Sequence, residues 1–154
     1  MQDEDALRAL DAHYQAMPPV ASMQLRIDGY DGETLALAAP LALHVNDKGC
    51  AFGGSLVSLL TLAGWGLVTL HIRQAGLEAD VFVADSEVRY LAPLFADLRA
   101  QARIEEGESR DDFVATLRER GRARTTVIAT VPLPEGGVAT TCRARFVAVA
   151  RRHG

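Results

Sequence analysis

A polar stretch, Asn46-Asp47-Lys48-Gly49-Cys50-Ala51-Phe52-Gly53-Gly54-Ser55, runs directly into the apolar segment Leu56–Leu70. Two adjacent glycines let another molecule approach the backbone closely, because neither has a Cβ atom. The first N–H groups of a helix have no partner within it, and the helix dipole adds partial positive charge there. We therefore predict a helix that starts at Gly53 and Gly54. We expect its first N–H groups, together with the side-chain amide of Asn46, to polarise a carbonyl oxygen that gains negative charge during a reaction.

The pattern around this segment predicts a single α+β domain over residues 1–154, with an N-terminal helix within residues 1–18. The chain has 154 residues, of which 49% are hydrophobic and 23% charged, as in folded globular proteins. Residues 3–16 are expected to form a short helix that Pro18 and Pro19 end. Alternating apolar and polar residues at 23–28 and 34–37 predict a hairpin.

Strand-like sequence dominates the part of the chain after the apolar segment. The candidate strands are residues 81–91, 98–104, 113–131 and 138–150. Residues 111–119 fit a short helix or a strand equally well. One antiparallel sheet wrapped around one long central helix satisfies this order of elements, and such sheets often pair edge to edge in dimers.

The apolar segment also meets the length criterion for a membrane span, because no Asp, Glu, Lys or Arg occurs between Gly49 and Ile72. Its glycines, serines and threonines dilute its hydrophobicity. A helix that is apolar on all sides can equally be surrounded by its own protein. We prefer the buried helix and expect no membrane association.

Composition argues against several classes of partner. The net charge is −4, and basic residues do not alternate with aromatic ones, so we expect no nucleic acid. Most of the arginines lie after residue 98, either on a solvated face or in a patch for phosphate or an acidic partner. Cys50 and Cys142 lack metal-ligand spacing, and no secretory signal is evident. A cytoplasmic protein without a metal site fits best.

Three motifs resemble one known family. They are Asn46-x5-Phe52-Gly53-Gly54-Ser55, Leu62-Ala63-Gly64-Trp65-Gly66-Leu67 and Val83-Ala84-Asp85-Ser86-x2-Arg89-Tyr90-Leu91-x-Pro93. Over about residues 12–150 the chain resembles the YiiD C-terminal-domain family, a thioesterase-like hotdog group that includes MadB-type malonyl-ACP decarboxylases. The resemblance implies a hotdog fold, and homodimers or higher assemblies with each site at a subunit interface.

The resemblance also implies a substrate class and site residues. Hotdog enzymes act on acyl groups held as thioesters to coenzyme A or acyl carrier protein, so no cofactor is expected besides the 4′-phosphopantetheine arm of the substrate carrier. The catalytic candidates are Asn46, Gly53, Ser55 and Asp85. The substrate-binding candidates are Phe52, Gly54, Ser86, Arg89 and Tyr90.

The chain departs from the better-known phenylacetyl-CoA-type thioesterases at two positions. Those enzymes place His directly before Gly-Gly and an acid nine residues after that His, where this chain has Phe52 and Thr61. Neither side chain can act as a general base at neutral pH. Asp85 could activate water instead, and His44 could act as acid or base if its loop folds inward.

Three functions remain open from the sequence. Decarboxylation of a malonyl thioester needs oxyanion donors but no activated water, and we favour it for that reason. Hydrolysis of an acyl thioester needs the same donors and a base such as Asp85. A domain that binds acyl thioesters without converting them is the third possibility.

Overall fold

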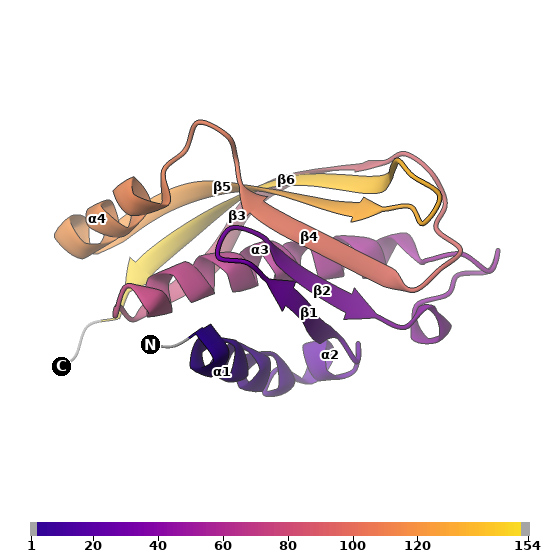
Figure 1. Cartoon of the computed structure of the whole chain (residues 1–154), viewed down its shortest axis with the longest axis horizontal. Helices are drawn as coiled ribbons and strands as arrows, with labels where there is room; N and C mark the ends of the chain where they lie inside the picture. The colour runs from indigo at the N-terminus through magenta and orange to yellow at the C-terminus, as the bar shows by residue number, and fades with distance from the viewer. Residues whose placement is uncertain (1–2, 152–154) are drawn as a thin grey trace.

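One antiparallel sheet curls around the long helix α3 in the computed structural model, which describes residues 3–151 (Figure 1). The strand order is β1-β2-β4-β5-β6-β3, and every neighbouring pair is antiparallel. The elements are α1 (Asp3–Gln15), α2 (Pro18–Ala21), β1 (Arg26–Tyr30), β2 (Leu35–Ala39), the 3-10 helix η1 (Leu41–Leu43), α3 (Gly53–Gln74), β3 (Ala79–Tyr90), β4 (Leu98–Ile104), α4 (Arg110–Arg120), β5 (Arg122–Pro132) and β6 (Val138–Ala150). This arrangement confirms the predicted α+β fold with a sheet wrapped around one central helix.

Most elements lie where the sequence pattern predicts them. Helix α1 and the β1–β2 hairpin match their predictions to within a few residues, and β4 and β6 match the predicted ranges 98–104 and 138–150. The predicted single domain spans residues 1–154, of which 1, 2 and 152–154 lie outside the described part of the chain.

The ambiguous segment after β4 is a helix, α4, and its ends explain why. Ser109 caps the first turn, because its hydroxyl accepts a hydrogen bond of 3.1 Å from the Asp112 N–H. Gly121 ends the helix with a left-handed φ of 72°, which glycine adopts without strain. The predicted strand over residues 113–131 is therefore shorter at its start and begins at Arg122 as β5.

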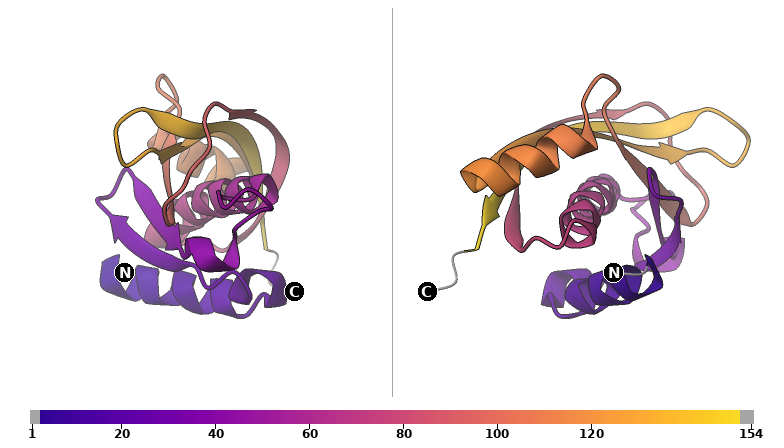
Figure 2. Two further views of the ribbon diagram at one scale, coloured as in Figure 1. Left: turned by 90° about the vertical axis from the view of Figure 1, so that its right-hand side faces the viewer. Right: turned by 60° about the vertical axis from the view of Figure 1, so that its left-hand side comes forward.

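Helix α3 is the core helix of the domain. Figure 2 shows the sheet curving over one side of α3 and α1 lying along another side. By length and apolarity α3 could cross a membrane, but 67% of its most apolar window is buried inside the protein. Burial by the sheet and α1 accounts for an apolar character on all sides of the helix.

Two glycines of the Ala63-Gly64-Trp65-Gly66 motif allow this close packing. A Cβ atom on Gly64 would lie 2.9 Å from the Phe146 ring on β6. A Cβ atom on Gly66 would overlap the hydroxyl of Tyr14, which is fully buried and donates a 2.6 Å hydrogen bond to the Leu62 carbonyl. The two glycines are therefore required because α1 and the sheet pack closely against the backbone of α3 at these positions.

Strand β3 forms one edge of the sheet, and it is mostly exposed. Within residues 3–151, the exposed large apolar side chains lie on β3, just after it, or before the start of α3. They are Leu43, Val45, Phe52, Phe82, Val83, Tyr90, Leu91 and Phe95. An unpaired edge with apolar side chains is a common site of association between chains.

Candidate active site

The first turn of α3 presents backbone donors that have no acceptor. Phe52 precedes the helix with extended backbone and forms no side-chain cap, and the first backbone bond of the turn runs from the Leu56 N–H to the Phe52 carbonyl at 3.0 Å. Among residues 3–151, no acceptor forms a hydrogen bond with the N–H groups of Gly53, Gly54 or Ser55. These donors, at the positive end of a 22-residue helix, can bind an oxygen that carries negative charge.

Two aromatic side chains flank this turn. The Tyr90 hydroxyl donates to the Gly53 carbonyl, with 3.1 Å between the two oxygens. A Cβ atom on Gly53 would lie 3.4 Å from the Tyr90 ring, and one on Gly54 only 2.6 Å from the Phe52 ring. Both residues are more than half exposed, at 55% for Phe52 and 57% for Tyr90. A substrate that reaches the N–H groups would therefore also contact these two rings.

Asn46 lies on the loop before α3, and its side chain stabilises that loop. Its Oδ1 atom accepts hydrogen bonds from the N–H groups of Lys48 at 2.8 Å and Cys50 at 3.2 Å. Its Nδ2 atom lies 3.3 Å from the Cys50 sulfur. The turn-forming role that Asn often has is therefore present. One of the two amide hydrogens has no partner among residues 3–151, so Asn46 could still donate to a substrate.

The loop carrying Asn46 is attached firmly to the helix start. The Phe52 N–H donates to the His44 carbonyl at 2.7 Å, and the Ala51 N–H donates to the Leu94 carbonyl at 2.8 Å. Asn46 and the free N–H groups therefore belong to one rigid segment, because these bonds hold both ends of the loop.

His44 and Ser55 form a pair that the sequence did not reveal. His44 is buried, with 7% of the residue exposed. Its Nε2 atom lies 2.8 Å from the Met23 carbonyl oxygen, and its Nδ1 atom lies 2.8 Å from Ser55 Oγ. A carbonyl oxygen only accepts, so Nε2 carries the hydrogen, and in the neutral ring Nδ1 accepts from the Ser55 hydroxyl. The loop does fold inward, as the acid–base hypothesis for His44 requires. The Ser55 hydroxyl, in the first turn of α3, is therefore hydrogen-bonded to the His44 imidazole, which can act as a base.

The structure does not bring Asp85 to this turn. Asp85 pairs with Arg145 across β3 and β6, and both of its carboxylate oxygens accept from that guanidinium. This hydrogen bond holds the pKa of Asp85 below its usual value. Arg145 is exposed, whereas its neighbours Ala144 and Phe146 are buried on the side of α3. Asp85 therefore projects from the outer face of the sheet, which corrects the expectation that it faces the site.

A β-bulge in β3 is the reason why Asp85 faces outward and not toward α3. Val83 pairs with the inward-facing Phe146, and simple alternation would turn Asp85 inward as well. The register shifts between Val83 and Asp85, so Ser86 pairs with the buried Ala144 and faces α3 instead. The same register turns Tyr90 toward α3 and Arg89 away from it. Of the four candidates on β3, Ser86 and Tyr90 share the helix side.

Comparison with known proteins agrees with this architecture. The family model described as "Putative thioesterase (yiiD_Cterm)" matches residues 8–150. A solved protein of unknown function from Chlorobaculum tepidum TLS is 27% identical, with a TM-score of 0.85 over 96% of this chain and 94% of that one.

Two further structures show the same fold. A protein described as "putative thioesterase from Shewanella oneidensis" is 24% identical, with a TM-score of 0.84 over 95% of this chain and 99% of that one. A Pseudomonas aeruginosa protein described as "Probable Thioesterase" is 21% identical, with a TM-score of 0.79 over 98% of this chain and 97% of that one. The match of the family model to nearly the whole chain shows that the protein belongs to the YiiD C-terminal-domain family of thioesterase-like hotdog proteins.

Proposed function

We propose that the protein decarboxylates a malonyl thioester of acyl carrier protein or coenzyme A and so supplies an acetyl thioester for the start of fatty-acid synthesis. Membership in a thioesterase-like family gives the general substrate class, an acyl thioester. The observation that carries the proposal is the set of N–H groups of Gly53, Gly54 and Ser55, which have no acceptor among residues 3–151. Donors in this arrangement stabilise an enolate oxygen.

The proposed step uses these groups as follows. The bond between the malonyl carboxylate and the methylene carbon breaks, carbon dioxide leaves, and the electron pair moves into the thioester to form an enolate. The N–H groups of Gly53 and Gly54 hold the enolate oxygen, and the free amide hydrogen of Asn46 is a third donor. The Ser55 hydroxyl or a water molecule returns one proton to carbon, and the solvent replaces that proton.

The orientation of Asp85 supports decarboxylation over hydrolysis with a carboxylate base. Phe52 and Thr61 occupy the positions of the missing His and acid, and the Asp85 carboxylate is bound to Arg145 on the outer face of the sheet. Loss of carbon dioxide needs no base, and this supports decarboxylation as the proposed reaction.

Hydrolysis of an acyl thioester is a second candidate because of the His44–Ser55 pair. In this reaction Ser55 Oγ attacks the thioester carbonyl while His44 Nδ1 accepts the hydroxyl proton. The thiol leaves with that proton, and water then hydrolyses the acyl-serine with Nδ1 as the base. The same free N–H groups would hold the oxyanion.

We also propose that the protein is a cytoplasmic homodimer in which two copies pair antiparallel along β3. Edge strands with exposed apolar side chains favour such pairing, and a twofold axis makes the contact self-complementary. The far end of β3 carries Tyr90, which contacts the start of α3. The start of α3 in one copy would therefore approach the first residues of β3 in the other copy, with the 4′-phosphopantetheine arm between them.

Mass spectrometry of the reaction products tests the proposal. The purified protein is incubated separately with malonyl-ACP and with a saturated acyl-CoA. Acetyl-ACP without free thiol supports decarboxylation, free thiol supports hydrolysis, and binding without conversion supports a non-catalytic module and overturns both reactions. Asp85→Asn serves as a control, because an outward-facing carboxylate should leave either rate within about twofold; a large loss would return Asp85 to the mechanism.

A further inference from the structure

The outer face of the sheet, which points away from α3, has an uneven distribution of charge. Strands β4, β5 and β6 contain six arginines and no aspartate, glutamate or lysine. Arg145 projects from the outer face, and the register and alternation of the three strands place the other five on the same face. All six are exposed, namely Arg99, Arg103, Arg122, Arg124, Arg143 and Arg145. The net charge of the chain is −4, so this basic character is local.

Acidic side chains from neighbouring segments neutralise three of these arginines. The ion pairs join Arg99 to Asp28, Arg143 to Glu105 and Arg145 to Asp85. The side chains of Arg103, Arg122 and Arg124 form neither hydrogen bonds nor ion pairs among residues 3–151. Arg103 lies beside the glutamates of the loop that follows β4, and these reduce its local positive charge. Arg122 and Arg124, at the start of β5, are therefore the strongest candidates for binding a partner.

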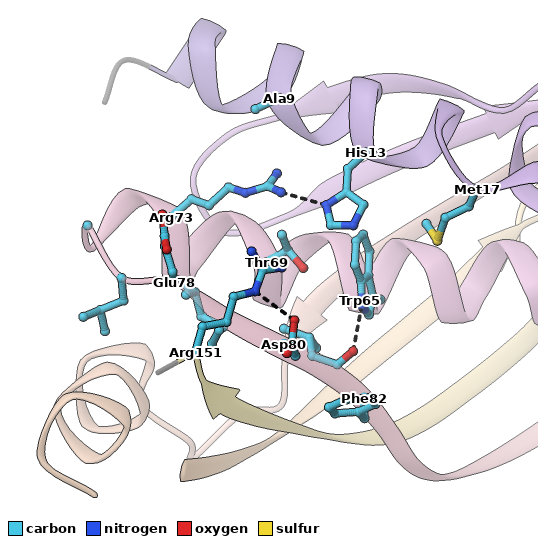
Figure 3. Close-up of a pocket in the computed structure, with 15 residues that line it drawn as sticks. Ala9, His13, Met17, Trp65, Thr69, Arg73, Glu78, Asp80, Phe82 and Arg151 are labelled. Carbon is cyan, nitrogen blue, oxygen red and sulfur yellow. Dashed lines mark hydrogen bonds and ion pairs between the residues drawn. The ribbon is translucent and has the colours of Figure 1, made fainter. Parts of the chain in front are cut away.

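Two acidic side chains close to Arg122 and Arg124 are bound to other groups. Asp80 lies in the same row of the sheet as Arg122, but it is paired with Arg151, with 2.9 Å between Oδ1 and Nε (Figure 3). The Glu108 carboxylate, which lies near Arg124, accepts a hydrogen bond of 3.0 Å from a backbone N–H of β5. The two guanidinium groups therefore remain available to carboxylates from outside the chain.

Apolar side chains lie between these two arginines and the edge of the sheet. The register pairs Arg124 with Val147 on β6 and Val147 with Phe82 on β3, so all three share the outer face. Arg122 is paired with Val149 in the same way. Phe82 is 57% exposed. We call the surface formed by these five residues the outer patch; it is basic along β5 and apolar toward β3.

The composition of the outer patch suits an acidic protein. Arginine binds carboxylates through a fork of N–H donors, and arginine and aromatic residues are enriched where proteins meet. An apolar side chain of the partner that covers Phe82 would add the gain from removing this ring from water. A free phosphate ion could use the two arginines but not the ring. The patch therefore favours a protein surface with Asp or Glu around an apolar residue.

In the dimer proposed above, the outer patch of one copy lies near the candidate active site of the other copy. The start of α3 contacts Tyr90 at the far end of β3, and antiparallel pairing brings that end beside the first residues of β3 in the other copy. Strands β6 and β5 of the other copy follow at about 4.8 Å per strand, so its Arg122 and Arg124 lie about 14 Å from the strand that carries Tyr90. A thioester on a flexible arm can span this distance.

We propose that the outer patch docks an acidic acyl carrier protein, with carboxylates of the carrier on Arg122 and Arg124 and an apolar side chain of the carrier on Phe82. This docking rests on the proposed function, because it makes the carrier protein, and not coenzyme A, the natural holder of the thioester. Binding of the carrier can nevertheless be measured without any reaction, so the two proposals can be tested separately.

Fluorescence anisotropy with a labelled holo-acyl carrier protein that bears no acyl group measures the docking. For the parent protein, binding should weaken several-fold between ionic strengths of about 0.01 M and about 0.15 M, because the Debye length falls from about 30 Å to about 8 Å. The double variant Arg122→Gln/Arg124→Gln should bind about tenfold more weakly at the lower ionic strength, since two exposed ion pairs are lost. Arg26→Gln/Arg99→Gln removes two arginines from the other end of the same face and is the matched control.

Steady-state kinetics connect the docking to turnover. The double variant Arg122→Gln/Arg124→Gln should lower kcat/KM for malonyl-ACP by about tenfold and leave kcat/KM for malonyl-CoA within about twofold, because coenzyme A has no protein surface to dock. Phe82→Ala should weaken carrier binding to a similar extent at both ionic strengths, because it removes an apolar contact and no charge.

Four outcomes would overturn the docking: no binding of the carrier to the parent protein, binding that does not depend on salt, equal losses in the two double variants, or equal losses of kcat/KM for malonyl-ACP and malonyl-CoA. The first two use the parent protein and do not depend on how any variant folds. Failure of the proposed function gives a different result. Carrier binding with the expected variant effects but without an acetyl product would keep the outer patch as a docking surface and overturn decarboxylation.

Discussion

His44 and Ser55 are joined by a 2.8 Å contact between Nδ1 and Oγ, at the point where the loop before α3 meets the first turn of that helix. The other ring nitrogen of His44 is fixed by the Met23 carbonyl, also at 2.8 Å. The direction of the Ser55 hydroxyl is therefore set by a base whose tautomer is itself determined. The pair lies beside N–H groups that have no acceptor among residues 3–151.

Ser55→Ala separates the two candidate reactions. If Ser55 is the nucleophile of hydrolysis, release of free thiol should fall by up to about 10⁶-fold, as when the nucleophile of a serine protease is removed. Decarboxylation should fall by about tenfold or less, because water can return the proton to carbon. Both products are quantified by mass spectrometry. Ser58→Ala, an exposed serine on the same helix, is the control. Unchanged rates for both products would exclude Ser55 from the chemistry.

Asn46 can be tested in a way that separates its loop role from its donor role. Asn46→Asp keeps the two acceptor bonds to Lys48 and Cys50 but loses the amide hydrogens. Asn46→Ala loses the acceptor bonds and the amide hydrogens. Both variants should lower turnover by about 10²–10³-fold, as the loss of one oxyanion donor does. Only Asn46→Ala should also lose about 1–2 kcal/mol of stability, from two hydrogen bonds of about 1 kcal/mol each. A fully active Asn46→Asp enzyme would show that the loop role alone matters.

The fold could be predicted well from the sequence, because its main signals are local or periodic. The glycine pair and the apolar run locate α3, and the turn at Pro132–Gly137 separates β5 from β6. Segment 111–119 remained ambiguous because its apolar residues show little helical periodicity. Its helical state depends on the Ser109 and Gly121 caps at its ends.

The candidate site was less predictable, because its geometry depends on contacts between distant segments. The bulge between Val83 and Asp85 exchanges the faces of Asp85 and Ser86, and alternation alone cannot detect one extra residue. His44 and Ser55 are each unremarkable in sequence and meet only because the loop returns to the helix start.

Gly66→Ala should destabilise the protein, because the new Cβ atom would overlap the buried Tyr14 hydroxyl. We expect a loss of about 1–3 kcal/mol, as for other overpacked cores, measured by denaturant unfolding. Tyr14→Phe in the same chain should recover part of the loss, giving a favourable coupling energy in a double-mutant cycle. Gly29→Ala is the control, since its Cβ would meet no atom within 4 Å. Equal losses with and without Tyr14→Phe would disprove the overlap.

His71 should make stability depend on pH between about 4 and 6.5. The ring is buried on α3, and burial followed by the charge of Arg110 lowers its pKa to about 4. The unfolded chain binds a proton below about pH 6.5 and the folded chain does not until about pH 4, so stability is complete above pH 6.5 and falls with pH through this window. At pH 5 the loss from this group should be about 2 kcal/mol. His71→Asn should lack this loss when unfolding free energies at pH 7 and pH 5 are compared; parallel pH curves for the two proteins would contradict it.

Val83→Lys tests the proposed pairing of two copies along β3. Val83 is 47% exposed near the middle of this edge strand, and a lysine there places two charges close to the twofold axis of an antiparallel pair. Light scattering should therefore give the chain mass of 16.6 kDa for the variant and twice that mass for the parent protein. Ala12→Lys adds the same charge at an exposed position on α1 and should leave the dimer intact.

If the active site spans the interface, turnover should fall by about 10²-fold when the dimer is lost, because the substrate is no longer held in position between the two copies. A monomeric variant with full activity would confine the site to one copy, and a dimeric Val83→Lys protein would show that the copies associate through a different surface.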